Sequence, residues 1–396
     1  MKWRDRHKVV GDGVARCAST DIRLVLHRTI PEDSEFRRQW NDLVMLMESP
    51  EVFYTWEWAR AVSHAYGARV QLMAFAAYRG DEMIGVAALK FDTDGYLSFL
   101  ANTTADYCDF VSHPDDRQQF LRLLLSEIRK MNLPRLRLAN VPADSASIAG
   151  IKSAVKDCSF SLFLRPAYMC AQIILDSESA RLSTANSAKR RLKKLLAVGS
   201  KFGELTVRLT HSWDEFAPEF LAYVKAHVAR FSEMNQSSNL IQPERQVFLA
   251  ELAKLLSEKG WLAVSTLKLN SETIAWNYGF IFACKWFYYQ PTFVNGLERL
   301  SPGTCLLSEI IAAAAADPRI RMVDLGLGDE DYKRRYTLSG CQTVEMTAHS
   351  SRVELQRIAF RYHAAQFVKK SPRLEKIVRV CRKRPATANL GPPVQA

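Results

Sequence analysis

The sequence lacks most of the features that mark membrane-spanning, secreted and zinc-binding proteins. None of its eight cysteines forms a Cys-x-x-Cys pair, which argues against a zinc site or a disulfide framework and favours reduced thiols. The start of the chain has no apolar core of the length that a signal peptide needs. The longest apolar run, around residues 310–316, is far shorter than a membrane span. We therefore expect a cytoplasmic protein.

Acidic residues are scarce relative to basic ones, and the basic excess is concentrated in two segments. The chain has 42 Asp and Glu against 54 Lys and Arg, which gives a formal net charge of +12. Residues 181–201 hold seven bases and no acid, and residues 351–384 hold eleven bases and two acids. Local positive charge suggests a polyanionic partner such as nucleic acid, a phosphate compound or an anionic membrane. A solvated helix face explains the charge equally well.

Length and apolar pattern predict a large folded protein. The 396 residues are enough for two domains or one duplicated unit, and a hydrophobic fraction of 48% allows a sizeable core. Apolar spacing predicts helices over 34–47, 56–66 and 115–130. Pairs of apolar runs around a polar turn predict β-hairpins over 71–91 and 261–282. Strands interleaved with helices and hairpins indicate an α/β or mixed α+β fold.

A short repeat indicates that one unit is duplicated. The residues LLSEI occur at 124–128 and again at 306–310, and each copy is followed by a predicted strand that begins Pro-Arg. Each copy also holds the same place in a matching series of predicted elements. Identity of five residues can arise by chance, but identity at equivalent places favours duplication. The basic segment between the halves has helix-cap candidates before it, so it is predicted to be a bridging helix.

The stretch RLSPGTCLLSEI, residues 299–310, is the first candidate for ligand binding. Ser301 can cap a helix, and Gly303 permits close approach of another backbone. Free N–H groups at a helix N-terminus attract anions together with the helix dipole, and Arg299 adds positive charge. The stretch therefore predicts either a phosphate site or an ordinary capped helix.

The stretch VDLGLGDEDYKRRY, residues 323–336, is the second candidate. An apolar strand meets two glycines and then a cluster of acids and bases. If the charged part is helical, Asp329 and Lys333 lie four residues apart on one face and can pair. The functional interpretation is a carboxylate base beside a cation, at the end of a strand that borders a ligand crevice.

Weaker candidates lie upstream. Tyr289 and Gln290 follow an aromatic strand and can line a cleft. His227 and Arg230 lie three residues apart on a predicted helix and can reach a substrate, although such a pair is also typical of a solvated face. Cys305 has no histidine nearby in the sequence, so a cysteine nucleophile is not expected.

With LSPGTCLLSEI followed closely by VDLGLGDEDYKRRY, the sequence resembles the CelD/BcsL-like acyltransferases of cellulose and exopolysaccharide synthesis, which are part of the GNAT superfamily. The resemblance extends to FYTWEWARAVSHAYG, YRGDEMIGVAAL and ADYCDFV, and it covers about residues 35–350. It implies tandem GNAT-like units, arranged as in the FemABX transferases, each with a mixed, mostly antiparallel sheet flanked by helices. The expected boundaries are a flexible N-terminus at 1–20, a degenerate GNAT-like unit at 21–180, a basic bridging helix at 181–202, a GNAT unit with the acyl-CoA site at 203–350, a basic helical extension at 351–384 and a disordered tail at 385–396.

The resemblance also implies how the donor is held. An acyl-CoA, most simply acetyl-CoA, would bind at the helix N-terminus around Ser301, Gly303 and Thr304, with Arg299 beside it. No metal is implied. The acceptor would be an amine or hydroxyl of a sugar, a polysaccharide precursor or a small molecule. The residues that would line its side of the cleft are Tyr289, Gln290, His227 and Arg230.

The catalytic residues that this resemblance implies lie in the charged cluster. Asp329 or Glu330 would act as the base, directly or through a water molecule. Lys333 would stabilise developing charge or hold an anion of the substrate. Tyr332 would protonate the leaving thiolate or pack against its neighbours.

Two other functions stay open on the sequence alone. A FemABX-like aminoacyl transferase would use charged tRNA, whose phosphates suit the bases at 189–194. A non-catalytic partner of a membrane-bound polysaccharide synthase would dock through the basic C-terminal helix, as a peripheral protein at the inner membrane. The GDEDYK segment argues against this last function, because a scaffold does not need it. Nucleic acid other than tRNA is not expected as a partner.

Overall fold

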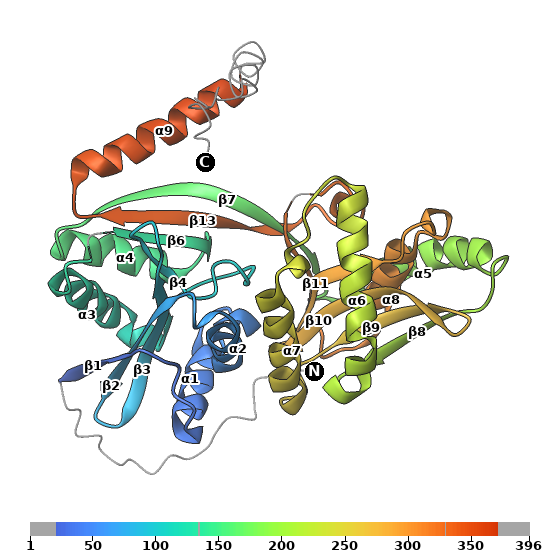
Figure 1. Cartoon of the computed structure of the whole chain (residues 1–396), viewed down its shortest axis with the longest axis horizontal. Helices are drawn as coiled ribbons and strands as arrows, with labels where there is room; N and C mark the ends of the chain where they lie inside the picture. Colours follow the sequence, from blue (N-terminus) through green and yellow to red (C-terminus); the bar gives the residue numbers. More distant parts are fainter. Residues whose placement is uncertain (1–20, 134, 329, 371–396) are drawn as a thin grey trace, which may run out of the picture.

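The structure is a computed structural model that describes residues 21–133, 135–328 and 330–370. The predicted flexible start at 1–20 and the predicted tail at 385–396 lie outside these residues. The candidate base Asp329 lies outside them too. In the described chain, two halves of similar layout are joined by long strands (Figure 1).

The first half contains a strand, two helices, a hairpin and then alternating strands and helices. Its elements are β1 (Ile22–His27), α1 (Ser34–Leu46), a 3-10 helix (Val52–Tyr54), α2 (Trp56–Tyr66), β2 (Gln71–Arg79), β3 (Glu82–Phe91), β4 (Leu97–Phe99), β5 (Val111–Ser112), a 3-10 helix (Pro114–Asp116), α3 (Arg117–Lys130), β6 (Arg135–Pro142), α4 (Ala146–Asp157) and β7 (Ser161–Ile174). The predicted hairpin over 71–91 is confirmed. Gly80 makes its turn at a φ of +61°, which glycine adopts without steric conflict.

The second half follows the same order up to its last crossover. Its elements are α5 (Glu178–Gly199), β8 (Leu205–Thr210), α6 (Trp213–Glu233), a 3-10 helix (Asn239–Ile241), α7 (Pro243–Glu258), β9 (Val264–Leu269), β10 (Glu272–Phe282), β11 (Lys285–Phe293), a 3-10 helix (Glu298–Leu300), α8 (Pro302–Ala316), β12 (Met322–Leu327), a 3-10 helix (Lys333–Arg335), β13 (Gly340–His349) and α9 (Arg352–Lys370). Helices α6 and α7 pack on one face of this half of the sheet, and α8 packs on the other with α5 outside it.

The strand order shows that the two halves exchange a strand. The sheet runs β1-β2-β3-β4-β6-β13-β7-β12-β11-β10-β9-β8, and β5 pairs with β3. Strand β13 of the second half pairs with β6, and β7 of the first half pairs with β12. Strands β7 and β13 also pair with each other and run side by side from one half to the other (Figure 1). Boundaries near residues 180 and 350 therefore divide the sequence into segments, but one sheet continues through both halves.

The mixed, mostly antiparallel sheet flanked by helices is confirmed, and its two parallel pairs lie at equivalent places. Strand β4 pairs parallel with β6, and β11 pairs parallel with β12. The crossover in each case contains the helix that carries LLSEI, which is α3 in the first half and α8 in the second. The repeat in sequence thus corresponds to a repeat in topology.

One hydrophobic core continues through the junction of the halves. Trp58 of α2 is fully buried and makes edge-to-face contacts with Phe248 of α7 and Phe280 of β10, each with 5.5 Å between ring centroids. Phe53 makes the same type of contact with Phe287 of β11 at 5.4 Å. Aromatic pairs of this geometry stabilise beyond the effect of burial alone. The halves are therefore parts of one folded unit.

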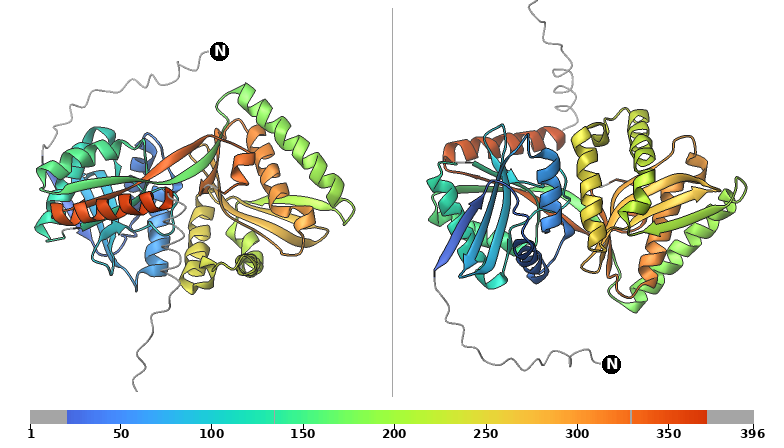
Figure 2. Two further views of the ribbon diagram at one scale, coloured as in Figure 1. Left: turned by 90° about the horizontal axis from the view of Figure 1, so that it is seen from above. Right: turned by 60° about the horizontal axis from the view of Figure 1, so that its bottom comes forward.

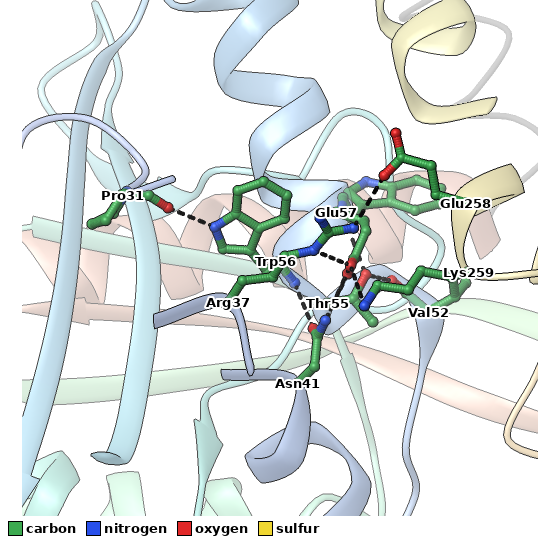
Figure 3. A network of polar contacts seen from close by, with 10 residues as sticks. Pro31, Arg37, Asn41, Val52, Thr55, Trp56, Glu57, Glu258 and Lys259 are labelled. Atoms are coloured by element: carbon green, nitrogen blue, oxygen red, sulfur yellow. Dashed lines mark hydrogen bonds and ion pairs between the residues drawn. The ribbon is translucent and has the colours of Figure 1, made fainter. Parts of the chain in front are cut away.

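A polar network fixes α1 and α2 against the end of α7 (Figure 3). Glu57 is fully buried and accepts hydrogen bonds from Arg37 Nε and from Asn41 Nδ2, both at 2.9 Å. The Glu57 carboxylate also lies 3.9 Å from Lys259 Nζ, and Arg37 lies 3.6 Å from Glu258. A buried carboxylate is destabilising unless it is paired. Glu57 therefore holds the first half against the second.

Helix α9 contacts β7 and β13 and otherwise extends away from the fold (Figure 1), and seen from above it lies over these two strands (Figure 2). Leu355 is buried, and Tyr362 packs edge-to-face on Phe163 of β7. Phe360 and Phe367 are exposed to solvent. Within the residues described, we find no helix with the length and apolar character that crossing a membrane requires. Docking of α9 on a membrane or a synthase stays a prediction.

We expect Glu57→Gln to lower the free energy of unfolding by about 3 kcal/mol, because Arg37 then loses its buried partner. Denaturant titration measures the change. Glu35→Gln is the matched control, since Glu35 and its partner Arg38 are 57% and 60% exposed. An exposed pair of this kind contributes little to stability, because solvent and salt screen it. Equal effects of the two substitutions would contradict the assigned role of Glu57.

Candidate functional site

Strands β11 and β12 diverge in the second half. They pair in parallel from Lys285 and Met322 as far as Phe287 and Asp324. Beyond this point β11 continues to Phe293, with an irregularity in its pairing with β10 after Phe287, whereas β12 turns at Gly326 with a φ of +74°. The divergence leaves the backbone and side chains of both strands free to line a cavity.

Two adjoining cavities occupy this divergence. The larger has a volume of about 630 Å³ and the smaller about 190 Å³. They share Arg230, Tyr288, Pro291 and Tyr332 as wall residues, so together they form one cleft. Residues 102–106 of the first half complete the wall of the larger cavity. The cleft therefore lies at the junction of the two halves.

The predicted phosphate helix, α8, begins beside the smaller cavity. Gly303 and Thr304 line this cavity, and no side chain caps the first turn of the helix. Ser301 adopts a φ of +47°, and its hydroxyl donates to the Glu298 carbonyl at 3.2 Å instead of capping. Arg299 is exposed on the turn before the helix. The backbone N–H groups of the first turn are thus available to an anion.

A buried carboxylate anchors the end of β12 to the first half. Asp324 accepts hydrogen bonds from the Tyr107 hydroxyl at 2.7 Å and from Gln172 of β7 at 3.0 Å. It also accepts from the Gly326 N–H at 2.8 Å. Three donors satisfy this carboxylate, so its role is structural. It fixes the turn at Gly326 against the segment that carries Tyr107.

Asp106, next to Tyr107, lines the larger cavity beside this turn. Desolvation and the nearby Asp324 carboxylate raise the pKa of Asp106 to about 7, against the opposing effect of Lys333. A Cβ at position 326 would lie 2.7 Å from Asp106 Oδ2, so glycine at 326 makes room for the carboxylate. A carboxylate that titrates near neutral pH suits proton transfer to and from a bound group. The sequence interpretation assigned no role to Asp106, although its place between apolar residues in ADYCDFV is a signal of partial burial.

The charged segment after β12 is not the helix that the sequence suggested. Among the described residues, only a 3-10 turn forms there, because Lys333 points inward. Its Nζ donates to the carbonyls of Gly326 at 3.0 Å and Leu327 at 2.7 Å, and it forms an ion pair with Glu330 at 2.8 Å. The predicted pair of Lys333 with Asp329 falls on a residue outside the described part of the chain. Lys333 therefore holds the end of β12 in its turned conformation.

The predicted catalytic residues that the structure describes come together in the wall of the cleft: Glu330, Tyr332 and Lys333. Lys333 is only 3% exposed, whereas the Glu330 side chain is half-exposed. Tyr332 borders both cavities. Burial and the Glu330 charge raise the pKa of Tyr332, so its phenol stays protonated at neutral pH.

The predicted acceptor residues also lie in the wall of the larger cavity: His227, Arg230, Tyr289 and Gln290. His227 is buried, with Nδ1 2.8 Å from the Ser238 hydroxyl and Nε2 3.3 Å from the Gln290 amide nitrogen. Burial and the charges of Arg230 and Arg245 lower the pKa of His227 to about 4. His227 is therefore neutral at pH 7 and supports the wall through hydrogen bonds.

Arg245 of α7 belongs to the same wall and was missed in the sequence. It is 5% exposed and donates from Nη2 to the Tyr289 hydroxyl at 2.7 Å and to Gln290 Oε1 at 3.2 Å. A single arginine in a helix is usually exposed, so nothing in the local pattern distinguished it. It is buried because α7 packs against α2 at the junction of the halves.

The equivalent opening in the first half is closed. Residues 101–110 lie beside β6, where the Cys108 N–H donates to the Asn140 carbonyl at 2.9 Å. Asp116 precedes α3 and pairs with Arg79, so a carboxylate already lies at that helix N-terminus. A cavity of about 30 Å³ in this half is lined from α1, α2, β3, β4 and β5, and no residue of α3 or β6 lines it. The first half thus contributes Asp106 to the cleft.

Cys305 lies in α8 directly after Thr304, which lines the smaller cavity, and is buried. Burial and the Glu309 charge raise the pKa of its thiol to about 11. The thiol is protonated at neutral pH, so Cys305 is not an activated nucleophile.

Residues 183–334 match the family model described as an acetyltransferase (GNAT) domain. This part of the chain therefore carries a GNAT-type acetyltransferase domain. The matched range includes α8, the diverging strands β11 and β12, and the charged turn after them. No curated protein matches the sequence.

Two solved structures share the fold across both halves. FemX superposes with a TM-score of 0.57 at 11% identity, covering 85% of this chain and 99% of its own. A conserved protein of unknown function from Bacteroides thetaiotaomicron superposes with a TM-score of 0.53, also at 11% identity, covering 83% of this chain and 100% of its own. At this identity the likeness concerns the fold alone.

We expect Asp106→Asn to stabilise the protein at pH 8 and to change little at pH 4. The pKa of Asp106 rises from 3.8 to about 7 on folding, so the native state loses stability as the pH increases between these values. The gain at pH 8 is up to about 4 kcal/mol, since one pKa unit corresponds to about 1.4 kcal/mol. Denaturation at a series of pH values measures it.

Asp94→Asn is the control with the opposite sign. Burial is the largest single influence on Asp94 and opposes the change, but the hydrogen bond and the charge of Arg137 together lower its pKa, so its ionised form stabilises the fold at neutral pH. Loss of stability in Asp106→Asn at pH 8 would contradict the raised pKa.

Proposed function

We propose that the protein is an acyltransferase that moves an acyl group, most simply acetyl, from acyl-CoA to an amine or hydroxyl of an acceptor. The observation that carries the proposal is the cleft where β11 and β12 diverge beside the uncapped N-terminus of α8. The GNAT match over residues 183–334 supports it. The resemblance to the CelD/BcsL-like family favours a sugar or polysaccharide precursor as the acceptor.

The smaller cavity is the proposed donor side. The N–H groups of Gly303 and Thr304 would hold the pyrophosphate of CoA, where the helix dipole favours negative charge. Tyr336 lines the same cavity and stacks under the guanidinium of Arg191, 4.1 Å from its ring centroid. The basic helix α5 therefore borders this side of the cleft, where its charge would attract further phosphate.

Asp106 is the proposed general base, in preference to the two acids that the sequence suggested. As the acceptor nitrogen or oxygen bonds to the acyl carbon, its proton would pass to the Asp106 carboxylate, directly or through water. The pKa of about 7 makes this transfer feasible at neutral pH. Glu330 already forms an ion pair with Lys333, so we do not assign it as the base.

Collapse of the tetrahedral intermediate breaks the carbon–sulfur bond, and the thiolate that leaves needs a proton donor. Tyr332 is the proposed donor because it is protonated and borders both cavities. Lys333 is a positioning residue, since its amine already binds the carbonyls of Gly326 and Leu327. It would keep the turn at Gly326 beside Asp106.

A second candidate is aminoacyl transfer from charged tRNA, as in the FemABX-like alternative. The likeness in fold to FemX, with a TM-score of 0.57, favours it. So do the exposed bases on α5: Lys189, Arg190, Lys193 and Lys194. Asp106 could serve as the base with either donor, so binding experiments separate the two functions better than substitution of Asp106.

We expect acetyl-CoA to raise the melting temperature, with a stabilisation of about 2.7 kcal/mol at a hundred times its dissociation constant. Gly303→Val should abolish this shift, because a Cβ at 303 already lies 3.2 Å from the Phe293 ring and two further methyl groups narrow the cavity. Asp106→Asn is the control that should keep it. A shift with charged tRNA but with no CoA compound would favour the second candidate and contradict the first.

We expect Asp106→Asn to lower kcat/KM by about 10²–10⁴-fold with any acceptor that supports turnover, as is typical on loss of a general base. In the unaltered protein kcat/KM should rise with pH through about 7, and the substitution should remove this dependence. Asp109→Asn is the matched control, because Asp109 bonds to Ser145 in the first half. A variant at 106 with full rate would exclude Asp106 as the base.

A further inference from the structure

Two arginines in the wall of the larger cavity have no anionic partner among the described residues. Arg245 is 5% exposed, and its Nε and Nη1 have no hydrogen-bond partner. Its Nη2 bonds only to neutral groups, the Tyr289 hydroxyl and the Gln290 amide. Arg230 packs over the Phe293 ring at 4.2 Å, and the groups that act on its charge are tyrosine hydroxyls.

Arg117 is a second buried arginine, and in contrast to Arg245 its guanidinium pairs with a carboxylate. Arg117 is 7% exposed, close to the value for Arg245. Both of its terminal nitrogens donate to the Glu48 carboxylate, at 2.7 and 2.6 Å. A buried charge is usually compensated in this way, because removing it from water is unfavourable. The missing counter-charge at Arg245 therefore needs an explanation.

Among the described residues, none forms an ion pair with Arg245. The groups that act most strongly on its charge are the hydroxyls of Tyr289, Tyr66 and Tyr223. Burial raises the pKa of each of these phenols, so all three stay protonated. Asp106 lies on the first-half side of the cavity. Of the several groups that influence its pKa, Arg245 has the weakest effect.

We propose that Arg245 and Arg230 form an anion-binding wall that receives a carboxylate or phosphate group of the acceptor. Both side chains line the larger cavity, and the charges of both lower the pKa of His227 in the same wall. A guanidinium offers paired N–H donors that match the oxygens of either group. Asp106 belongs to the same cavity, so an acceptor bound to this wall would carry its nucleophilic group toward a base. The assignment to the acceptor rests on the proposed function, whereas the anion site itself does not.

The proposal predicts an unusual response to substitution. A structural arginine stabilises the folded state, so Arg117→Gln should lower the melting temperature. Arg245→Gln instead removes an uncompensated charge, and it should leave the melting temperature of the ligand-free protein unchanged or higher. A purely structural role for Arg245 would give the same loss of stability in both variants.

The binding test titrates sodium phosphate and sodium acetate against sodium chloride at equal ionic strength, with CoA present to fill the donor side. We expect at least one of the two anions to bind the unaltered protein, and the stronger one identifies the class of group. Its dissociation constant should rise at least tenfold in Arg245→Gln and in Arg230→Gln. Arg28→Gln, which alters an exposed arginine directly after β1 at the far edge of the sheet, should leave it unchanged.

Several outcomes would overturn the proposal. Phosphate and acetate could bind no better than chloride, or binding could persist in both cavity variants. If Arg245→Gln does not fold, Arg230→Gln and Arg245→Lys still decide, since the first should weaken binding and the second should retain part of it. If CoA itself does not bind, the donor assignment is contradicted, and the titration is repeated in Gly303→Val to judge the anion wall separately.

Discussion

The pairing of β7 with β13 is the interaction on which the rest of the structure depends. Each of these strands comes from one half and completes the sheet of the other, through β12 and β6 respectively. Without the exchange, β6 and β12 would present open edges whose backbone groups lack partners inside the protein. Neither half can satisfy its own sheet, so the two halves are held in one arrangement by backbone hydrogen bonds.

The fixed arrangement allows one site to be built from both halves. Trp58 packs on aromatic residues of the second half, and buried Glu57 pairs across the same junction. Tyr107 of the first half bonds to Asp324 at the end of β12. These contacts bring Asp106 to the turn at Gly326, where it meets a cavity that the second half alone would leave open on one side.

The cleft contains buried charged groups that lack the paired partner found for buried charges elsewhere in the described protein. Elsewhere buried charges are paired, as in Arg117 with Glu48. In the cleft, Asp106 is desolvated beside a second carboxylate, and Arg245 has no counter-ion. Such locally unfavourable states persist only where the surrounding fold imposes them, and they are typical of functional sites. The first half also contains buried carboxylates with raised pKa values, but each has a partner: Glu51 pairs with Lys285, and Asp109 accepts a hydrogen bond from Ser145.

The local sequence determined the secondary-structure elements and the part of the site formed by the start of α8 and the segment after β12. Apolar spacing predicted the helices at 34–47 and 56–66 and the hairpin at 71–91. Burial of one face of an element requires apolar residues at a short, regular spacing in the sequence. The repeated LLSEI located the two equivalent crossovers. The glycines and charges after β12 indicated a crevice, although the expected helix was wrong, since Lys333 bonds to carbonyls of the strand end.

Only the tertiary structure decided which strands pair, which opening stays empty and which charges are buried. The exchange of β7 and β13 joins segments about 170 to 190 residues apart, and no local pattern specifies a partner at that distance. Asp106 and Arg245 look like ordinary polar residues in their own segments. Their altered environment comes from neighbours in the other half, so it appears only when the two halves are packed together. The sequence by itself determined the elements and their order, and long-range pairing decided the chemistry of the cleft.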